Sequence, residues 1–468
     1  MQTSSIRQPI MIDTLSQLDK GDKLNLESRF EIQNKDETYL SHQYAVPIRR
    51  HQVEEAKAAH STNFQASFTL LKCFIGAGIL ALPYSFHQVG MIPAILTLTF
   101  VGIMTYYCMS LLMQVADAKK GTRLETMAYD VLGTWGMYAV EITVSLHQFG
   151  SSTASLMLAT KFLNYLFCNL GFDVLCGTKS LQVLVCLLVV VPLSTINNMH
   201  WFYIPSIASS TLALTGIATQ LSYDLDIIQS NPEVQRSFLE NFTSMEISNL
   251  PMFIGVAVYM FEGVGTFFNI RAAMARPSDF PILLKYQMFV VVLLYILFAS
   301  LCYLALGANI PGIVIFALPV RGWYIWIVGL YAVAVLMGYP LRLFPLLKIL
   351  ENSNFLKYRI FDQKLQTINW ALRYGVRFIL IILMLIIVFT AKSLNTLLSF
   401  IGSCISVFLA FILPLLMYNA YFASTISRSR KRFNQVLLCI GLTMGVVGAV
   451  VSFADMVGLR QGSGGGGH

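Results

Sequence analysis

The chain has 468 residues, of which 56% are hydrophobic and only 12% are charged. In soluble proteins, roughly a quarter of the residues are charged. The composition therefore excludes a cytosolic enzyme, a secreted disulfide scaffold and a disordered protein, and it favours an integral protein of the lipid bilayer.

Residues 1–63 form a polar segment with 8 basic and 9 acidic side chains. Such a segment cannot bury enough apolar surface to fold alone, so we expect a cytoplasmic tail that is available to a cytoplasmic partner. It lacks the apolar core of a signal peptide, and the first apolar span is expected to act as the targeting signal. At the other end, residues 461–468 (QGSGGGGH) resemble an artificial linker.

Eleven apolar spans follow the tail, each long enough to cross about 30 Å of hydrocarbon as a helix. Their approximate bounds are 64–88, 91–116, 136–166, 181–198, 201–228, 249–270, 283–307, 322–348, 370–390, 393–419 and 435–457. The expected fold class is an all-α integral membrane protein with eleven transmembrane helices. The spans divide into a first set of five at 64–228, an outer loop at 229–248, a second set of five at 249–419, and one extra helix.

The net charge of +8 is explained by the positions of the basic residues between the spans. Sixteen Lys and Arg residues lie in the gaps or the adjoining span ends on one side, and five lie on the other. Because cytoplasmic loops are enriched in Lys and Arg, the N-terminus is predicted inside and the C-terminus outside or in a lumen. The positive charge therefore does not imply a nucleic-acid partner.

Three residues in the predicted outer gaps suggest modifications. Asn241 lies two residues before Thr243 and forms a glycosylation sequon. Cys168 and Cys176 share the gap after the third span, where a disulfide and two free thiols are both open. No Cys or His spacing typical of a metal site is found, and we expect no cofactor and no catalytic residue.

A short motif recurs at a constant distance along the chain. The first span contains FIGAG at residues 74–78, and the sixth contains FEGVG at residues 261–265. Each motif opens a set of five spans, and because five is odd, the two sets enter the membrane from opposite sides as an inverted repeat. Each Gly weakens a helix by about 1 kcal/mol relative to Ala. The motifs therefore predict two interrupted helices, which membranes tolerate where the unwound backbone lines a cavity.

Such a cavity favours a ligand that carries both charges. Helix N-termini after the interruptions offer N–H groups to a carboxylate, and the carbonyl groups before them suit an ammonium group or a cation. An α-amino acid has both groups, although an anion or a small cation also fits. The candidate binding residues are Ile75, Gly76, Ala77, Gly78 and Ile79 in the first span, and Phe261, Glu262, Gly263, Val264 and Gly265 in the sixth. Phe261 is a candidate gate or pocket wall, with core packing as the alternative.

The stretches around these motifs resemble the amino acid/auxin permease family of the APC superfamily, in particular its proton-coupled and vacuolar amino acid transporters. The similar stretches are LKCFIGAGILALPY at 71–84, YMFEGVG at 259–265, GYPLRLFP at 338–345, FIGS at 400–403 and AFILP at 410–414. The resemblance implies a LeuT-type core of ten helices plus one, and amino acid transport driven by a proton or sodium gradient. The chain departs from the family pattern at Asn269, where members usually have Pro, and at Arg342, where many have Gln.

Five ionisable side chains within the spans are candidates for charge chemistry. Glu262 is predicted to bind the substrate amine or a proton, or else only to stabilise the interruption. His147 and Glu141 in the third span are candidates for a proton relay, with a packing histidine as the alternative. Lys72 either pairs with a carboxylate or reaches the cytoplasmic edge. Arg342 either contacts lipid phosphates or faces the core.

These features together predict a secondary transporter of neutral amino acids, coupled to protons. Between residues 330 and 345 the eighth span offers Tyr331 and Tyr339 but no Ser or Thr, which the resemblance implies for a sodium site. Spans 1, 2, 6 and 7 are expected to rock against spans 3, 4, 8 and 9 in alternating access. A sodium-coupled or cationic amino acid transporter and a non-transporting sensor or structural subunit remain open, as do the vacuolar, lysosomal and plasma membranes.

Overall fold

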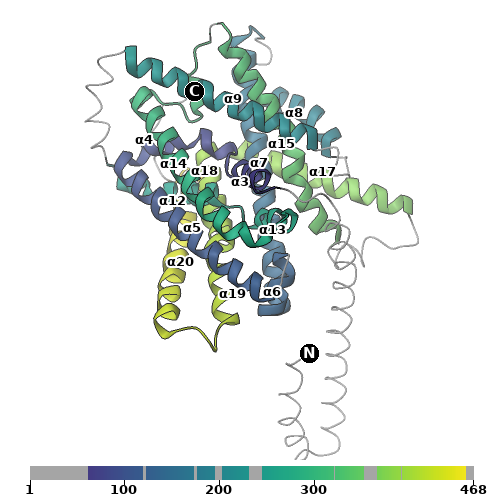
Figure 1. Ribbon diagram of the computed structural model, residues 1–468. Coiled ribbons are helices and arrows are strands. Elements are labelled where there is room, and N and C mark those ends of the chain that lie inside the picture. Colours follow the sequence, from purple (N-terminus) through teal and green to yellow (C-terminus); the bar gives the residue numbers. More distant parts are fainter. Residues whose placement is uncertain are drawn as a thin grey trace, which may run out of the picture. The chain divides into compact units, whose positions relative to one another are not determined.

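The computed structural model describes residues 62–119, 123–172, 176–194, 203–230, 245–320, 322–352, 366–391 and 393–459 (Figure 1). The chain divides into two units, of which the second is Thr62–Ala272 with Arg276–His468. Everything below concerns the second unit. Residues 1–61 of the predicted tail, the sequon at Asn241 and the linker at 461–468 lie outside the described residues.

The described residues form helices and no strand. The first set of helices is α3 (Asn63–Phe74), η1 (Ala77–Leu80), α4 (Leu82–Val89), α5 (Met91–Lys119), α6 (Leu124–Leu132), α7 (Thr134–Asn169), α8 (Lys179–Ser194) and α9 (Tyr203–Ser230). The second set is η3 (Ile247–Asn249), α12 (Leu250–Phe261), α13 (Val264–Ala273), η4 (Pro277–Asp279), α14 (Phe280–Leu306), η5 (Gly307–Asn309), η6 (Val314–Ala317), α15 (Tyr324–Asn352), α17 (Gln366–Thr390), α18 (Leu394–Ile401), η7 (Gly402–Ser406), η8 (Phe408–Ile412), α19 (Leu413–Tyr421) and α20 (Arg428–Val457). The all-helical class is therefore confirmed for the described residues.

Six of the described helical segments are long and apolar enough to cross a membrane. They are Met91–Lys119, Ile247–Phe268, Pro277–Asn309, Tyr324–Leu347, Leu394–Tyr421 and Arg428–Val457, and Tyr374–Thr390 is a shorter apolar helix. The chain is thus a multi-pass membrane protein. Helix α7 is longer than any of these, but polar residues along it lower its apolar character.

Several ends of the helices are fixed by local side chains. At the start of α3, Thr62 Oγ1 accepts a hydrogen bond from the backbone N–H of Gln65, and Gln65 Oε1 accepts one from the N–H of Thr62. This capping box satisfies two donors that the first turn of a helix leaves free. Helix α20 starts at Ser427, whose side chain accepts from the N–H of Arg430, and it ends at the left-handed Gly458.

Helix α12 lies in the interior, against α5, α18 and α20 (Figure 1). Its closest backbone contact joins Gly255 to Gly402, where a Cβ atom on Gly402 would lie only 1.8 Å from the Gly255 carbonyl oxygen. At this contact the tenth span widens into the π-helical turns η7 and η8. Turns of this kind are frequent at functional sites, and η7 packs directly against α12.

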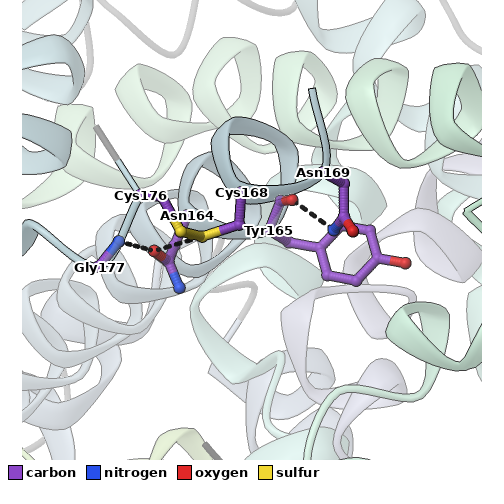
Figure 2. Close-up of a disulfide and its surroundings, with 6 residues drawn as sticks. All are labelled: Asn164, Tyr165, Cys168, Asn169, Cys176 and Gly177. Carbon is purple, nitrogen blue, oxygen red and sulfur yellow. Dashed lines mark hydrogen bonds between the residues drawn. A yellow bond between two sulfur atoms is a disulfide. The ribbon is translucent and has the colours of Figure 1, made fainter. Parts of the chain in front are cut away.

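A disulfide closes the turn after α7. Cys168 and Cys176 are bonded, with their Cα atoms 4.6 Å apart (Figure 2). Beside the bond, the side-chain oxygen of Asn164 accepts a hydrogen bond of 3.0 Å from the backbone N–H of Gly177. The bond and this contact tie the end of α7 to the segment that leads into α8.

Candidate functional site

The first predicted interruption is present where α3 ends. Helix α3 stops at Phe74, and the backbone of Ile75 (φ −79°, ψ 84°) and Gly76 (φ −120°, ψ −163°) leaves the helical region before η1 begins. No atom lies within 4 Å of the position that a Cβ atom on Gly76 would occupy. The unwound backbone at Gly76 therefore borders open space.

The second predicted interruption is present between α12 and α13. Glu262 is extended (φ −74°, ψ 130°), and the helix resumes at Val264, with Gly263 accepting hydrogen bonds from Thr266 and Phe267. A Cβ atom on Gly265 would also meet nothing within 4 Å. Helix α13 then runs through Asn269, so the chain resumes its helix without the proline that family members usually have.

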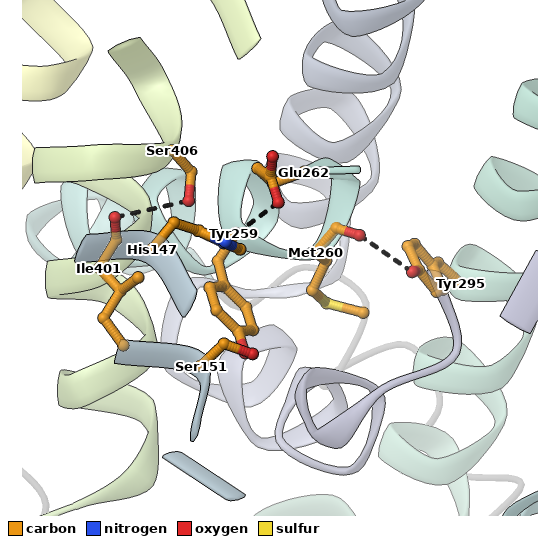
Figure 3. Close-up of polar contacts among 8 residues, drawn as sticks. All are labelled: His147, Ser151, Tyr259, Met260, Glu262, Tyr295, Ile401 and Ser406. Carbon is orange, nitrogen blue, oxygen red and sulfur yellow. Dashed lines mark hydrogen bonds and ion pairs between the residues drawn. The ribbon is translucent and has the colours of Figure 1, made fainter. Parts of the chain in front are cut away.

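A tyrosine hydroxyl connects the two interruptions. Tyr295 on α14 is completely buried and donates a hydrogen bond of 2.7 Å to the carbonyl oxygen of Phe74. The same hydroxyl lies 3.2 Å from the carbonyl oxygen of Met260, near the end of α12 (Figure 3). One side chain thus holds the ends of both first half-helices at a common point.

Glu262 faces α7 from the second interruption. Its Oε2 atom lies 3.2 Å from Nε2 of His147, and the two side chains are only 7% and 10% exposed (Figure 3). The two atoms are at ion-pairing distance, although their orientation is not that of a hydrogen bond. The contact brings an acid and a base together in a buried place, where a carboxylate without a partner is unfavourable.

Further polar side chains extend this contact along α7. His147, Ser151 and Ser155 follow one another at intervals of four residues, so they lie on one face of the helix. The Tyr259 hydroxyl donates to Ser151 Oγ over 3.3 Å, and the Tyr259 ring lies 5.8 Å from the His147 ring. The Arg342 guanidinium on α15 donates to Ser155 Oγ. We call the set His147, Ser151, Ser155, Tyr259, Glu262 and Arg342 the α7 cluster.

The Arg342 guanidinium contacts a buried side chain of α7. It donates to Ser155 Oγ, and Ser155 is only 1% exposed. Tyr259 lies within electrostatic range of both Arg342 and Glu262. The α7 cluster therefore combines one permanent positive charge, one carboxyl group and one imidazole.

Other sequence candidates lie apart from the α7 cluster. Glu141 has Glu125 as its charged neighbour, and half-buried Lys72 lies near the end of α3, before the first interruption. Phe261 is completely buried and packs against Tyr295, with ring centroids 5.4 Å apart, and beside Gly102 on α5. The structure thus gives Phe261 packing contacts on the side of α5 and α14.

The two tyrosines of the eighth span contact neighbouring helices. The Tyr339 hydroxyl lies 3.2 Å from the sulfur of Met384 on α17. The Tyr331 ring stacks on Phe162 of α7, with centroids 5.4 Å apart.

Sequence reasoning missed four members of the site, which are Ser151, Ser155, Tyr259 and Tyr295. Ser151 and Ser155 had a detectable signal, because their spacing from His147 marks a polar stripe on an otherwise apolar helix. Tyr295 had none, since it is one aromatic residue within a continuous apolar run. Its role follows only from the way in which α14 packs beside α3 and α12.

The chain is similar to known membrane transporters. The family model described as "Transmembrane amino acid transporter protein" matches residues 59–457. The chain is 28% identical over 390 residues to vacuolar amino acid transporter 4 of Saccharomyces cerevisiae, covering 78% of this chain and 53% of that protein. It is 28% identical over 388 residues to vacuolar amino acid transporter 3 of the same yeast, covering 82% of this chain and 55% of that protein.

A plant relative matches over more of its own length. The chain is 24% identical over 445 residues to amino acid transporter ANT1 of Arabidopsis thaliana, covering 88% of this chain and 98% of that protein. The chain thus spans about half the length of the yeast relatives and nearly all of the plant relative.

Proposed function

The chain belongs to the family of transmembrane amino acid transporter proteins, and we propose that it carries neutral amino acids across a membrane together with protons. The observation that supports proton coupling is the contact of 3.2 Å between Glu262 and His147 at an interrupted helix. The yeast relatives are named as vacuolar transporters, which supports a vacuolar or lysosomal membrane.

We propose a LeuT-type core of two inverted repeats at 64–228 and 249–419, with an eleventh helix at 435–457. Each of the eleven predicted spans contains a described helix or an interrupted pair of helices. The two interruptions also fall at corresponding places in the two repeats. The excess of Lys and Arg on one side supports a cytoplasmic N-terminus and a lumenal or external C-terminus.

The substrate is proposed to bind between the two interruptions. Its carboxylate would be received by backbone N–H groups that begin η1 and α13, where the helix dipole favours negative charge. Because the Tyr295 hydroxyl already contacts the carbonyls of Phe74 and Met260, Glu262 is the group best placed for the substrate ammonium. The positive charge of Arg342 opposes a cationic side chain, which supports neutral substrates.

Protonation of His147 is proposed to couple the two ligands. An imidazolium at Nε2 converts the contact with Glu262 Oε2 into a charge-assisted hydrogen bond, which is about twice as strong as a neutral one. Glu262 then stays ionised and fixed, with Oε1 available to the substrate ammonium. When the proton leaves His147, this restraint is lost and the substrate binds less tightly. Proton and substrate therefore bind cooperatively, as a symporter requires.

Uptake by the purified full chain in proteoliposomes tests this mechanism. A panel of labelled amino acids is offered with and without an imposed pH gradient, and counterflow is measured without one. We expect His147→Gln to retain counterflow but lose stimulation by the gradient, and Glu262→Gln to lose both. Glu141→Gln, on the same helix but outside the α7 cluster, is the control and should behave like the wild-type protein.

Two results would count against the proposal. Stimulation by the gradient that survives in both His147→Gln and Glu262→Gln would refute proton coupling through this pair. If the wild-type protein binds amino acids but transports none of the panel, the sensor alternative is favoured instead.

A further inference from the structure

A second buried carboxyl group lies on α9, apart from the α7 cluster. Asp224 and Gln220, one turn earlier, are both completely buried. Gln220 Nε2 donates a hydrogen bond of 2.9 Å to Asp224 Oδ1, and the Cys302 thiol on α14 lies beside the same carboxyl group. Asp224 is six residues before the end of α9, and Cys302 is four residues before the end of α14.

Two oxygen atoms in this group lack a donor. Asp224 Oδ2 and Gln220 Oε1 are buried, and neither has a hydrogen-bond partner. In the described part of the chain, no Lys, Arg or His side chain lies within ion-pairing distance of Asp224. An ionised carboxylate placed in this way would pay a desolvation penalty of several kcal/mol with no charge to offset it.

A proton on Asp224 would remove both the unpartnered oxygen atoms and the uncompensated negative charge. A neutral carboxylic acid gains an O–H donor, and an amide beside it can accept from that O–H while donating to the other oxygen. A single proton shared between Asp224 Oδ2 and Gln220 Oε1 would therefore give both oxygen atoms a hydrogen-bond partner. It would also neutralise the carboxyl group, which has no cation beside it among the described residues.

The other groups around Asp224 do not replace that proton. Helix α9 packs against α14, α15 and η6. The ionisable side chains beside Asp224 are Cys302 on α14 and Tyr223 on α9, and Tyr324 on α15 reaches the Tyr223 ring at 5.9 Å. The described residues of η6 are Val, Ile, Phe and Ala, none of which ionises. The ionisable groups named here are all acids, which are neutral when protonated. None of them can therefore supply a positive charge to an ionised Asp224.

We propose that Asp224 is a second proton-carrying residue of the transporter, protonated in this conformation and exposed to solvent when α9 separates from α14. The inference rests on the proposed function, in which α14 belongs to the moving helices while α9 packs along α15 of the scaffold. Separation of these helices breaks the contact with Cys302 and admits water to the carboxyl group. Hydration then favours the charged form, and the proton leaves.

Infrared spectroscopy of the full chain tests the protonation directly. The wild-type protein should show the carbonyl stretch of a buried carboxylic acid, and Asp224→Asn should lose it. Asp226→Asn, with an exposed side chain on the same helix, should retain it. Gln220→Leu should shift the stretch to higher frequency, because the carbonyl loses the hydrogen bond from the amide. Identical spectra for the wild type and Asp224→Asn, or a carboxylate band that responds to added sodium chloride, would overturn the proposal.

Transport in proteoliposomes tests the role of this proton. In Asp224→Asn, the ratio of uptake with a pH gradient to uptake without one should fall to about half of the wild-type ratio or less, while counterflow continues and shows that the variant is folded. Asp226→Asn should keep the wild-type ratio. An unchanged ratio in Asp224→Asn would overturn the carrying role. If the wild-type protein transports nothing, the proposed function fails, and the infrared result still decides whether Asp224 is protonated.

Discussion

The Tyr295 hydroxyl offers a direct test of the connection between the two interruptions. Tyr295→Phe removes one oxygen atom and leaves the ring that packs against Phe261. The Phe74 carbonyl keeps a contact of 2.9 Å from the Gly76 N–H, whereas Met260 loses its contact of 3.2 Å with the hydroxyl. The expected cost is that of one buried hydrogen bond plus an incompletely satisfied carbonyl, about 1–3 kcal/mol.

The loss of this hydrogen bond should lower both the free energy of unfolding and the substrate affinity of Tyr295→Phe. If the hydroxyl holds the interruptions in the binding arrangement, substrate affinity should fall by roughly 5- to 150-fold, since 1.4 kcal/mol corresponds to a factor of ten. Equilibrium binding of labelled substrate and thermal unfolding of the purified protein measure the two effects. Tyr286→Phe, at an exposed position on the same helix, controls for the substitution.

The result that would refute this reasoning is a Tyr295→Phe variant with the affinity and unfolding midpoint of the wild type. A lower midpoint with unchanged affinity would limit the hydroxyl to a stabilising role and remove it from the binding site.

Two other substitutions test separate parts of the structure. Gly402→Ala should sharply reduce the yield of folded protein, because its methyl group would lie 1.8 Å from the Gly255 carbonyl; Gly375→Ala, with nothing within 4 Å, should leave the yield in size-exclusion chromatography unchanged. Arg342→Gln should admit lysine and arginine to uptake by removing a positive charge beside Ser155, and continued exclusion of both cations would contradict the proposed basis of selectivity.

The interruptions were predictable from the sequence because their cause is local. Paired glycines weaken a helix wherever they occur, and the recurrence of the FIGAG and FEGVG motifs gave their positions in both repeats. Backbone angles at Gly76 and Glu262 confirm this prediction.

The contacts of the site were not predictable in the same way. His147 and Glu262 lie on distant parts of the chain, and hydrophobic periodicity says which face of a helix is polar but not which partner it meets. For Arg342, a contact with lipid phosphates and a position facing the core were both compatible with the sequence. The contact with Ser155 becomes visible only once α15 packs along α7.

The number of membrane crossings shows a related limit. Composition gave eleven spans, while six described helices are both long and apolar enough to qualify. Helix α7 has the length but carries His147, Ser151 and Ser155 among its apolar residues. The side chains that make it useful to the site also weaken its hydrophobic signal.

The bond between Cys168 and Cys176 has a consequence for biogenesis. Cytosolic thiols are kept reduced, whereas disulfides form in the lumen of the endoplasmic reticulum. The proposed orientation, with a cytoplasmic N-terminus, puts the turn after α7 on the lumenal side, where this bond can form. The oxidation state of the two sulfur atoms in membranes from cells therefore tests the proposed orientation independently of the lysines and arginines.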